Sequence, residues 1–404
     1  ATIVQEGSVP IPRKGTHAHT VPSQGHRSSR DEAAAPGELP GPGGWHAAPL
    51  LLRPGARGAA LRRPLRSAPG GPREAVHREG RRGRSRSRQA VGGTRRGGHR
   101  WQQRHLESSI GVETVKALAY AGCRVVLASR SVEAGENAVE EEVKREGLGA
   151  YSVPDADVTV KRLDLADLGS VASFASEVLA TEERVDYLVL NAGVMALPEL
   201  QRTADGFEMQ MGVNHFGHAL LARLLRPKLE VQEFPSRIVS LASTAHKMAS
   251  SLDVSNLHYT RSDGDQYSAW GAYGRSKLAN VLFSKSLAQR LPEKVACVSV
   301  HPGVIRTPLW RSTPASGGLG GWLLGVLLAD KNVPQGAATT LWGCLSDEVR
   351  RTTFSGAYLS DCARGSVSSL GSDEVLAEKL WQATEAQLDA ALAKRGLSPD
   401  GSPL

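Results

Sequence analysis

Tyr273-Gly-Arg-Ser-Lys277 lies in a stretch with helical character and follows the strand-like run Arg237-Ile-Val-Ser-Leu-Ala-Ser243. On a helix, residues four apart share a face, so the phenol of Tyr273 and the ammonium of Lys277 are neighbours. A phenol has an unperturbed pKa of about 10, and a nearby positive charge lowers that pKa by favouring the ionised form. The Ser243 hydroxyl can then hold a substrate oxygen beside Tyr273. The pattern predicts an acid–base site, although a lone Tyr and Lys at this spacing is also an ordinary helix pair.

The chain on both sides of this site alternates between strand and helix patterns. The expected strands cover residues 123–128, 158–163, 185–190, 238–242 and 295–300. The expected helices cover residues 112–121, 133–145, 168–180, 206–225, 267–291, 334–345 and 373–393. Strands joined by helices indicate βαβ units, and hence an α/β fold with a Rossmann-like, doubly wound parallel sheet.

Other short motifs fall in order around Tyr273. They are Asn191-Ala-Gly193, Asn214, Ser243, Tyr273-Gly-Arg-Ser-Lys-Leu-Ala-Asn280 and His301-Pro-Gly303. Together they resemble the short-chain dehydrogenase/reductase family. The wording of residues 237–246 and of Ser355-Gly-Ala-Tyr-Leu-Ser-Asp-Cys362 resembles the retinol dehydrogenase branch. It is also similar to the WW-domain-containing oxidoreductases and the translocon-associated dehydrogenases of the chloroplast envelope.

The resemblance implies an NADP-dependent oxidoreductase that moves a hydride between nicotinamide and a carbonyl or alcohol carbon. The substrate would be lipophilic, of retinoid or steroid type. Tyr273 would be the general acid–base, and Lys277 would lower its pKa and hold the nicotinamide ribose. Ser243 would polarise the substrate oxygen, and Asn214 would complete a water-linked proton relay. No metal is expected, because His215 and His218 have no partners at metal spacing.

The expected cofactor contacts start at the strand of residues 123–128, which is the second strand of the family fold. Ser129-Arg130 follows that strand without an acidic residue, and an arginine there can pair a 2′-phosphate, which favours NADP over NAD. An exposed arginine at a strand end is the structural alternative. Asp164-Leu165 resembles the adenine contact of the family, or Asp164 caps the next helix. The other contacts that the resemblance implies are Ile110, Gly111, Asn191, Ala192, Gly193, Tyr273, Lys277, Pro302, Gly303 and Thr307.

The family fold also needs a first strand and a glycine turn, where a helix N-terminus meets the pyrophosphate. The sequence before the first helix is Arg100-Trp-Gln-Gln-Arg-His-Leu-Glu-Ser-Ser-Ile-Gly111, in which only Ile110 and Gly111 fit. We therefore expect the first strand and the turn to be missing or degraded. In a sheet ordered 3-2-1-4-5-6-7 that strand is central, so its loss would open the core beside Val125 and Val189.

The leading segment differs from the rest in composition. Residues 1–100 hold 19 Lys and Arg against 6 Asp and Glu, are rich in Gly and Pro, and show no apolar periodicity. We expect residues 1–107 to be disordered, residues 108–395 to form the dehydrogenase domain and residues 396–404 to be a disordered tail. An RNA-binding tail and an organelle transit peptide are alternative interpretations of the basic segment. The basic pI belongs to this segment, so no specific nucleic-acid partner is expected of the domain.

A reading-frame change offers a further interpretation of residues 1–107. Residues 98–105 can be encoded so that reading one base later gives Val-Thr-Gly-Gly-Asn-Ser-Gly-Ile, the missing pattern. The codon of Trp101 is fixed as TGG, and before a Gln codon it yields glycine in the shifted frame. We interpret the segment upstream of about residue 108 as out-of-frame or wrongly spliced translation.

Cysteine usage and hydropathy indicate the compartment and the partners. The four cysteines have no paired spacing, which favours a reducing compartment, cytoplasmic or plastid. No apolar run is long enough for a transmembrane segment, and no secretory signal is visible. Residues 310–330 could form a substrate lid or a buried helix, and residues 322–328 could contact a bilayer surface. The long helices at 206–225 and 267–291 could pair two copies as a homodimer.

The missing glycine turn leaves a second function open. A chain without it could be a catalytically impaired member of the fold that acts as a binding or scaffold protein. NADPH binding separates this alternative from the oxidoreductase.

Overall fold

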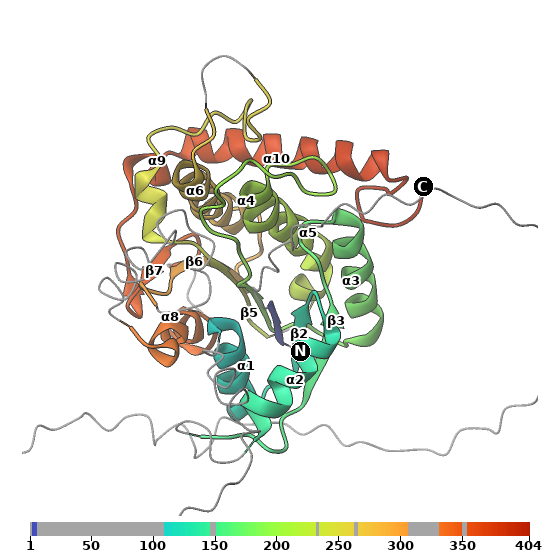
Figure 1. The fold of residues 1–404 in the computed structure, drawn as a ribbon. Coiled ribbons are helices and arrows are strands. Elements are labelled where there is room, and N and C mark those ends of the chain that lie inside the picture. Colours follow the sequence, from blue (N-terminus) through green and yellow to red (C-terminus); the bar gives the residue numbers. More distant parts are fainter. Residues whose placement is uncertain are drawn as a thin grey trace, which may run out of the picture. The chain divides into compact units, whose positions relative to one another are not determined.

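The computed structural model describes residues 2–5, 109–145, 151–231, 234–261, 266–305, 331–349 and 354–404. Within these ranges, one sheet has the strand order β3-β2-β1-β4-β5-β6-β7-β8 (Figure 1). All neighbouring strands are parallel except β7 and β8, which are antiparallel. The strands are β1 (Thr2–Gln5), β2 (Val125–Ser129), β3 (Val158–Arg162), β4 (Tyr187–Leu190), β5 (Ser236–Leu241), β6 (Val295–His301), β7 (Tyr358–Ser360) and β8 (Ala363–Arg364). The predicted Rossmann-like parallel sheet is confirmed.

The central strand β1 comes from the first residues of the chain. Thr2 lies opposite Val125 of β2 and Tyr187 of β4, and Val4 lies opposite Val189 of β4. Ile3 and Val4 are fully buried, in separate apolar clusters. Because side chains alternate along a strand, these two residues contribute to the cores on the two faces of the sheet.

The prediction that the first strand is missing is therefore wrong. The strand lies at residues 2–5 and not directly before the first helix, so the position beside Val125 and Val189 is filled. The interpretation of the whole leading segment as foreign to the fold is also wrong for these residues. For residues 6–108 it stays a prediction, because they lie outside the described residues.

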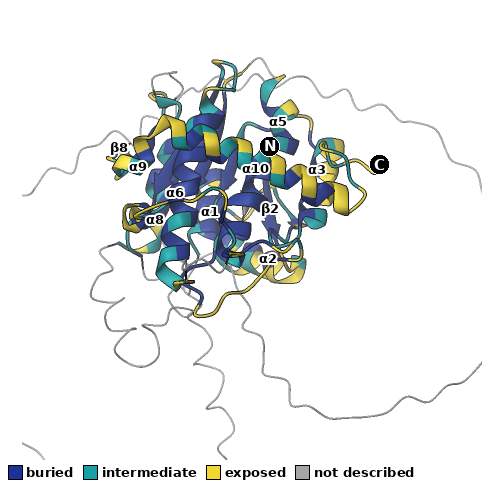
Figure 2. Ribbon diagram, turned by 90° about the horizontal axis from the view of Figure 1, so that it is seen from above, coloured by how far each residue is buried: buried dark blue, intermediate teal, exposed yellow. Residues whose placement is uncertain are grey.

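Helices cover both faces of the sheet, and apolar residues fill the space between (Figures 1 and 2). One layer contains α1 (Ile110–Tyr120), α2 (Val132–Ala138), the π-helical η2 (Val139–Lys144) and α8 (Val333–Leu345). The other contains α3 (Leu168–Thr181), α4 (Met209–Met211), the π-helical η3 (Gly212–Phe216), α5 (Gly217–Glu230), α6 (Ala269–Ala288) and α10 (Glu374–Lys394). The short helices η4 (Thr244–Met248) and α9 (Ser369–Ser372) complete the set. The first N–H groups of a helix lack partners within it, and polar N-caps supply them in the long helices other than α5, which follows η3 directly. These caps are Ser109, Asp167, Ser268, Asn332 and Asp373.

The C-terminal helix α10 packs against α6 and forms ion pairs with α5 (Figure 1). The ring of Trp381 stacks on Phe283 at a centroid distance of 5.3 Å. Arg223 of α5 pairs with Asp389 at 2.7 Å, and Arg290 pairs with Glu378 at 2.6 Å. These contacts place a helix of the same chain on surfaces that the homodimer prediction assigned to a second copy.

Residues 396–404 have a defined course, so the expected disordered tail is wrong. The amide of Leu404 donates to the carbonyl of Gly396 at 2.9 Å, and Leu397 forms an isolated bridge with Pro403. Asp400 accepts hydrogen bonds from Ser398 and from the backbone and hydroxyl of Ser402, which closes the turn between them. A prediction from composition assigns such polar turn residues to disorder, because composition does not show the local hydrogen bonds that order them.

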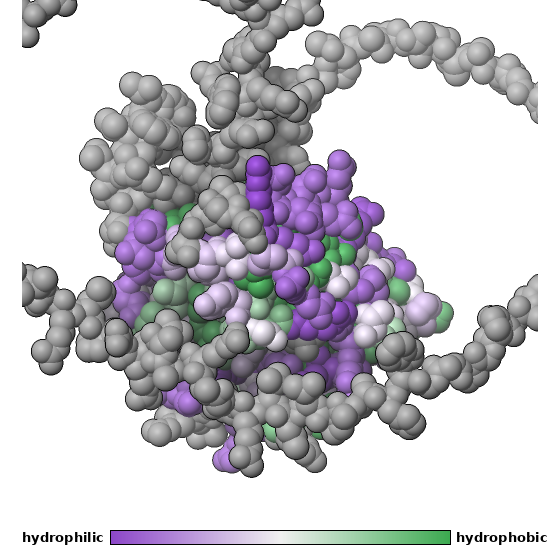
Figure 3. Space-filling model, turned by 90° about the horizontal axis from the view of Figure 1, so that it is seen from below, coloured by the Kyte–Doolittle hydropathy of each residue, from purple (hydrophilic) through white to green (hydrophobic). Residues whose placement is uncertain are grey.

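Several predicted features cannot be compared with the fold. Thr307, the segment 310–330 and its apolar part 322–328 lie outside the described residues. Within the described ranges, no helix has both the length and the apolar character needed to cross a bilayer. The surface in Figure 3 alternates between hydrophilic and apolar groups over the described part of that face.

Candidate active site

The predicted catalytic residues meet at the carboxyl ends of β4 and β5, beside the start of α6. Ser268 caps α6 by accepting a hydrogen bond from the amide of Gly271, so the helix begins at Ala269. Tyr273 and Lys277 follow within the first turns and are buried, with exposed fractions of 6% and 5%. A methyl group on Gly274 would lie 3.0 Å from the Ala245 carbonyl, so glycine permits the close approach of α6 to η4.

Tyr273 and Ser243 form the predicted hydroxyl pair. Ser243 follows β5 and caps η4, where its oxygen accepts a hydrogen bond from the amide of Ala245 at 3.1 Å. Burial raises the pKa of Tyr273 to about 12, and a hydrogen bond with the Ser243 side chain acts in the lowering direction. Burial dominates because removing a phenolate from water is costlier than one hydrogen bond can offset. The phenol is therefore protonated at neutral pH and can donate its proton.

Lys277 is directed at the backbone of β5. Its Nζ donates to the carbonyl oxygen of Leu241 at 2.8 Å and lies 5.8 Å from the centre of the Tyr273 ring. Asn280, one turn later, donates to the same oxygen at 3.0 Å. Burial lowers the pKa of Lys277 to about 8. Burial is the largest effect on the pKa of Tyr273 and acts in the raising direction. The expected lowering of that pKa by Lys277 stays a prediction.

Asn214 lies in the π-helical segment η3 and is fully buried. Its Oδ1 accepts from the amide of Val194 at 2.8 Å, and its Nδ2 donates to the Val194 carbonyl at 2.9 Å. Nδ2 also reaches the Ser276 hydroxyl at 2.9 Å, and the backbone carbonyl of Asn214 contacts Nδ1 of His218 at 3.0 Å. The side chain thus ties the loop after β4 to α6. The proton-relay role stays a prediction.

The loop after β4 approaches these side chains closely at Gly193. A methyl group there would lie 3.0 Å from Oδ1 of Asn214 and 3.5 Å from Nζ of Lys277. Only a residue without a side chain leaves this space open, so Gly193 of the predicted Asn191-Ala192-Gly193 motif lies against Lys277. The motif follows β4 at the topological switch point beside β1, where open α/β sheets bind ligands.

Other predicted cofactor residues lie at the same edge of the sheet. Pro302 and Gly303 follow β6, and Gly303 has φ +95°, a conformation that favours glycine. Ile110 and Gly111 form the first turn of α1, whose N-terminus carries a partial positive charge that can attract an anion. A methyl group on Gly336 would contact both Ile305 and Ile110, so the start of α1 and the segment after β6 are near each other.

The predicted adenine and phosphate contacts lie next to β2 and β3. Arg130 is exposed and follows β2, the neighbour of β1. Asp164 follows β3, and its Oδ1 accepts from the amide of Ala166 at 2.9 Å. The helix-capping alternative for Asp164 is wrong, because Asp167 caps α3. Leu165 is buried, and its backbone closely approaches Gly217 of α5.

Two polar residues near the site, one buried and one half-buried, were not predicted. Gln210 and Tyr267 bond to each other and to the loop that follows Gly193. Their one sequence signal is that Gln210 precedes Asn214 by four residues, which places both on one helical face. His215 and His218 are buried beside this network, and burial lowers both pKa values to about 3. In the described ranges, no group of three or more His, Cys, Asp or Glu is arranged to hold a metal ion.

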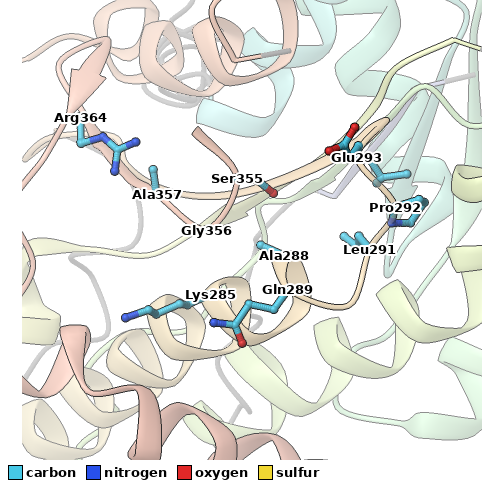
Figure 4. A pocket seen from close by; sticks show the side chains of 11 residues that line it. Lys285, Ala288, Gln289, Leu291, Pro292, Glu293, Ser355, Gly356, Ala357 and Arg364 are labelled. Atoms are coloured by element: carbon cyan, nitrogen blue, oxygen red, sulfur yellow. The ribbon is translucent and has the colours of Figure 1, made fainter. Parts of the chain in front are cut away.

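A cavity of about 440 Å³ lies at the opposite end of α6 (Figure 4). Lys285, Glu293 and Arg364 supply its charged lining, together with residues 355–357 that precede β7. A helix rises about 1.5 Å per residue, so Lys285 is some three turns beyond Tyr273. The cavity is therefore separate from the candidate active site.

Comparison with known proteins decides the family. A sequence model described as Enoyl-(Acyl carrier protein) reductase matches residues 105–353. The chain is 41% identical over 277 residues to retinol dehydrogenase 11 of Mus musculus, covering 68% of this chain and 81% of that protein. The chain belongs to the short-chain dehydrogenase/reductase family. Enzymes of this family typically use NAD or NADP.

Further relatives agree with this short-chain dehydrogenase/reductase assignment. Retinol dehydrogenase 12 of Homo sapiens is 39% identical over 277 residues, with 68% of this chain and 81% of the relative covered. Short-chain dehydrogenase TIC 32 A, chloroplastic, of Brassica napus is 37% identical over 283 residues, with 68% and 83% covered. A solved structure of an uncharacterized protein from Mycobacterium paratuberculosis matches with a TM-score of 0.53 at 28% identity, covering 70% of this chain and 90% of that one.

Proposed function

We propose that this short-chain dehydrogenase/reductase is an NADP-dependent oxidoreductase that acts on a carbonyl or alcohol carbon of a lipophilic, retinoid- or steroid-like substrate. The observation that carries the proposal is a pair of hydroxyls at the carboxyl edge of the sheet, on the buried Tyr273 and the half-buried Ser243, with Lys277 one helical turn away. A protonated phenol and a second hydroxyl at one place can bind a single carbonyl oxygen from two sides.

The residues present fit a nicotinamide dinucleotide. Gly193 leaves open the space that a methyl group would fill beside Lys277, and Gly303 has a conformation that favours glycine. The Lys277 ammonium has three N–H donors, and among the described residues Leu241 accepts one of them. The others can bind ribose hydroxyls. When bound, the cofactor supplies or accepts the hydride.

The protein's own groups handle the proton. Because burial raises the pKa of Tyr273 to about 12, the phenol holds its proton at neutral pH and releases it only to an oxygen that gains negative charge. Ser243 orients that oxygen by a hydrogen bond. Lys277, with a pKa near 8, can be charged or neutral in the working range and can return a proton to Tyr273. In the oxidation direction the same groups act in reverse.

Arg130 supports the preference for NADP. It follows β2, where the ribose of an adenosine is bound in dinucleotide folds, and its guanidinium can pair a 2′-phosphate. The lipophilic substrate is supported by the apolar surroundings of Tyr273, which packs in one cluster with Met195, Ala196 and Ala245. The names of the relatives, retinol dehydrogenases 11 and 12, point the same way.

Fluorescence titration with NADPH, followed by a turnover assay with retinaldehyde, tests the proposal. We expect binding of NADPH with an affinity at least tenfold higher than that of NADH, and NADPH oxidation that depends on the aldehyde. An Arg130→Ala variant should lose the preference while keeping NADH binding. Equal affinities of the wild type for both cofactors would contradict the NADP assignment.

One observation favours the second candidate, a catalytically impaired fold member that binds a partner. Residues 6–108 separate the end of β1 from the helix cap at Ser109, where a short glycine turn usually joins them. Without the turn, fewer backbone N–H groups face the pyrophosphate. Failure of the chain to bind either cofactor at millimolar concentration would favour this candidate over the oxidoreductase.

A further inference from the structure

A buried amide network lies between Asn214 and the start of α6. Gln210 is fully buried, and every polar atom of its side chain has a partner. Its Oε1 accepts from the amide of Ala196 at 2.7 Å, and its Nε2 donates to the Tyr267 hydroxyl at 3.1 Å and to the Ala269 carbonyl at 3.0 Å. Exchanging the oxygen and the nitrogen would place donor against donor at Ala196, so the amide has one satisfied orientation.

The loop held by this network is strained. Ala196 has φ +48° and no exposed surface, and residues other than glycine rarely adopt this conformation. Such a backbone persists only where its surroundings hold it. The Gln210 hydrogen bond is on the strained residue itself, and the Tyr267 hydroxyl donates to the next carbonyl, that of Leu197, at 2.8 Å.

Asn214 and Gln210 act on this loop in parallel. Asn214 holds Val194 and reaches Ser276 of α6, whereas Gln210 holds Ala196 and reaches Ala269 of α6. The two side chains lie four residues apart, so one short helical segment fixes two points of the loop against two points of α6. Met195 lies between the two held residues, and Ala196 is one of them. Both pack in the apolar cluster that contains Tyr273.

We infer that Gln210 is a positioning residue for the reaction, which sets the wall formed by Met195 and Ala196 at the correct distance from Tyr273. This inference rests on the proposed function. Gln210 acts through the loop and not by contact with the reacting atoms. Small displacements of groups that orient a substrate can lower turnover by about a hundredfold, although the fold and the cofactor site persist.

The test compares Gln210→Met with the wild-type full-length chain. Methionine keeps the length of the side chain but removes all three hydrogen bonds. We expect hydrogen exchange of the Ala196 amide to become about tenfold faster, because its acceptor is lost. We also expect kcat with a lipophilic aldehyde to fall about ten- to hundredfold, while NADPH affinity stays within about threefold because Asn214 still holds Val194 beside Gly193.

Two further variants separate positioning from general destabilisation. Gln382→Met on the exposed face of α10 removes a surface contact with Glu378 and should leave exchange and kcat unchanged. Tyr267→Phe should speed exchange around Leu197 more than at Ala196, because Gln210 still holds Ala196. Unchanged Ala196 exchange in Gln210→Met, or a loss of NADPH affinity as large as the loss of kcat, would overturn the inference.

Failure of the proposed function gives a different result. In that case the wild-type chain does not oxidise NADPH with any aldehyde offered, whatever residue stands at position 210. The exchange measurement then tests by itself whether Gln210 holds the loop at Ala196. Faster exchange at Ala196 in Gln210→Met supports this, and unchanged exchange overturns it.

Discussion

The ammonium nitrogen of Lys277 lies 2.8 Å from the carbonyl oxygen of Leu241, at the end of β5. This contact holds a cation inside the protein, where burial lowers the pKa of the lysine to about 8. The folded state therefore binds the proton more weakly than the unfolded state does. Below about pH 8 the buried lysine reduces the stability of the fold, and this cost is relieved as the pH rises toward 10.5.

Replacing this lysine should separate stability from activity. We expect Lys277→Met to raise the free energy of unfolding at pH 7 by about 1–3 kcal/mol, because the desolvation cost is removed. Turnover with NADPH and an aldehyde should fall at least about a hundredfold. Urea unfolding and a steady-state assay check both. Lys285→Met, farther along α6, removes a surface ion pair and should change stability by less than about 1 kcal/mol. A Lys277→Met protein that is less stable and still active would contradict this account.

Two buried histidines predict loss of stability in acid. Burial lowers the pKa values of His215 and His218 to about 3, whereas an unfolded histidine titrates near 6.5. Below pH 6.5 the unfolded state binds protons that the folded state does not, so the free energy of unfolding falls as pH falls toward 3. Between pH 7.5 and 5.5 we expect a loss of about 2–3 kcal/mol from the pair. In His218→Phe the loss should be smaller by about 1.4 kcal/mol, the contribution of one histidine over this range. A flat profile in the wild type would show that the histidines are not buried as described.

Strand β1 predicts an effect at the first residues of the chain. Ile3 is fully buried and lies opposite Val126 and Leu188 in the middle of the sheet. Ile3→Ala should reduce the free energy of unfolding by about 2–5 kcal/mol, because a cavity forms in the core on one face of the sheet. Leu404, which has an exposed fraction of 81%, serves as the control. Leu404→Ala should change the free energy of unfolding by less than about 0.5 kcal/mol. Equal stability of Ile3→Ala and the wild type would exclude this residue from the core.

The position of α10 predicts a monomer. It covers the outer surface of α5 and α6 through Trp381 and the ion pairs of Arg223 and Arg290. Light scattering coupled to size-exclusion chromatography should give the mass of one chain, 43.0 kDa, at micromolar concentration. Removal of residues 374–404 should expose the apolar surface around Phe283 and cause self-association. A dimer mass for the intact chain would contradict this assignment.

Features of the fold and the site that depend on local sequence pattern were predicted. Features that depend on residues far apart in the chain were not. Alternating strands and helices gave the parallel sheet, and the Tyr273 motif identified residues that do lie together. β1 was missed because strand and helix, normally joined by a few residues, are far apart in this chain. The spacing of Tyr273 and Lys277 shows a nearby cation but not the burial that raises the pKa of Tyr273. Gln210 was missed because its three partners come from two distant segments, the loop after β4 and the start of α6.

The most direct test of the central claim is NADPH oxidation with a lipophilic aldehyde by the wild type and by Tyr273→Phe. Phenylalanine keeps the ring of the buried side chain and removes the hydroxyl group that would donate the proton to the substrate oxygen. We predict that Tyr273→Phe binds NADPH as the wild type does and that its kcat is lower by about 10²–10⁴-fold. A wild-type rate in Tyr273→Phe would contradict the assignment of this tyrosine as the acid–base of the reaction.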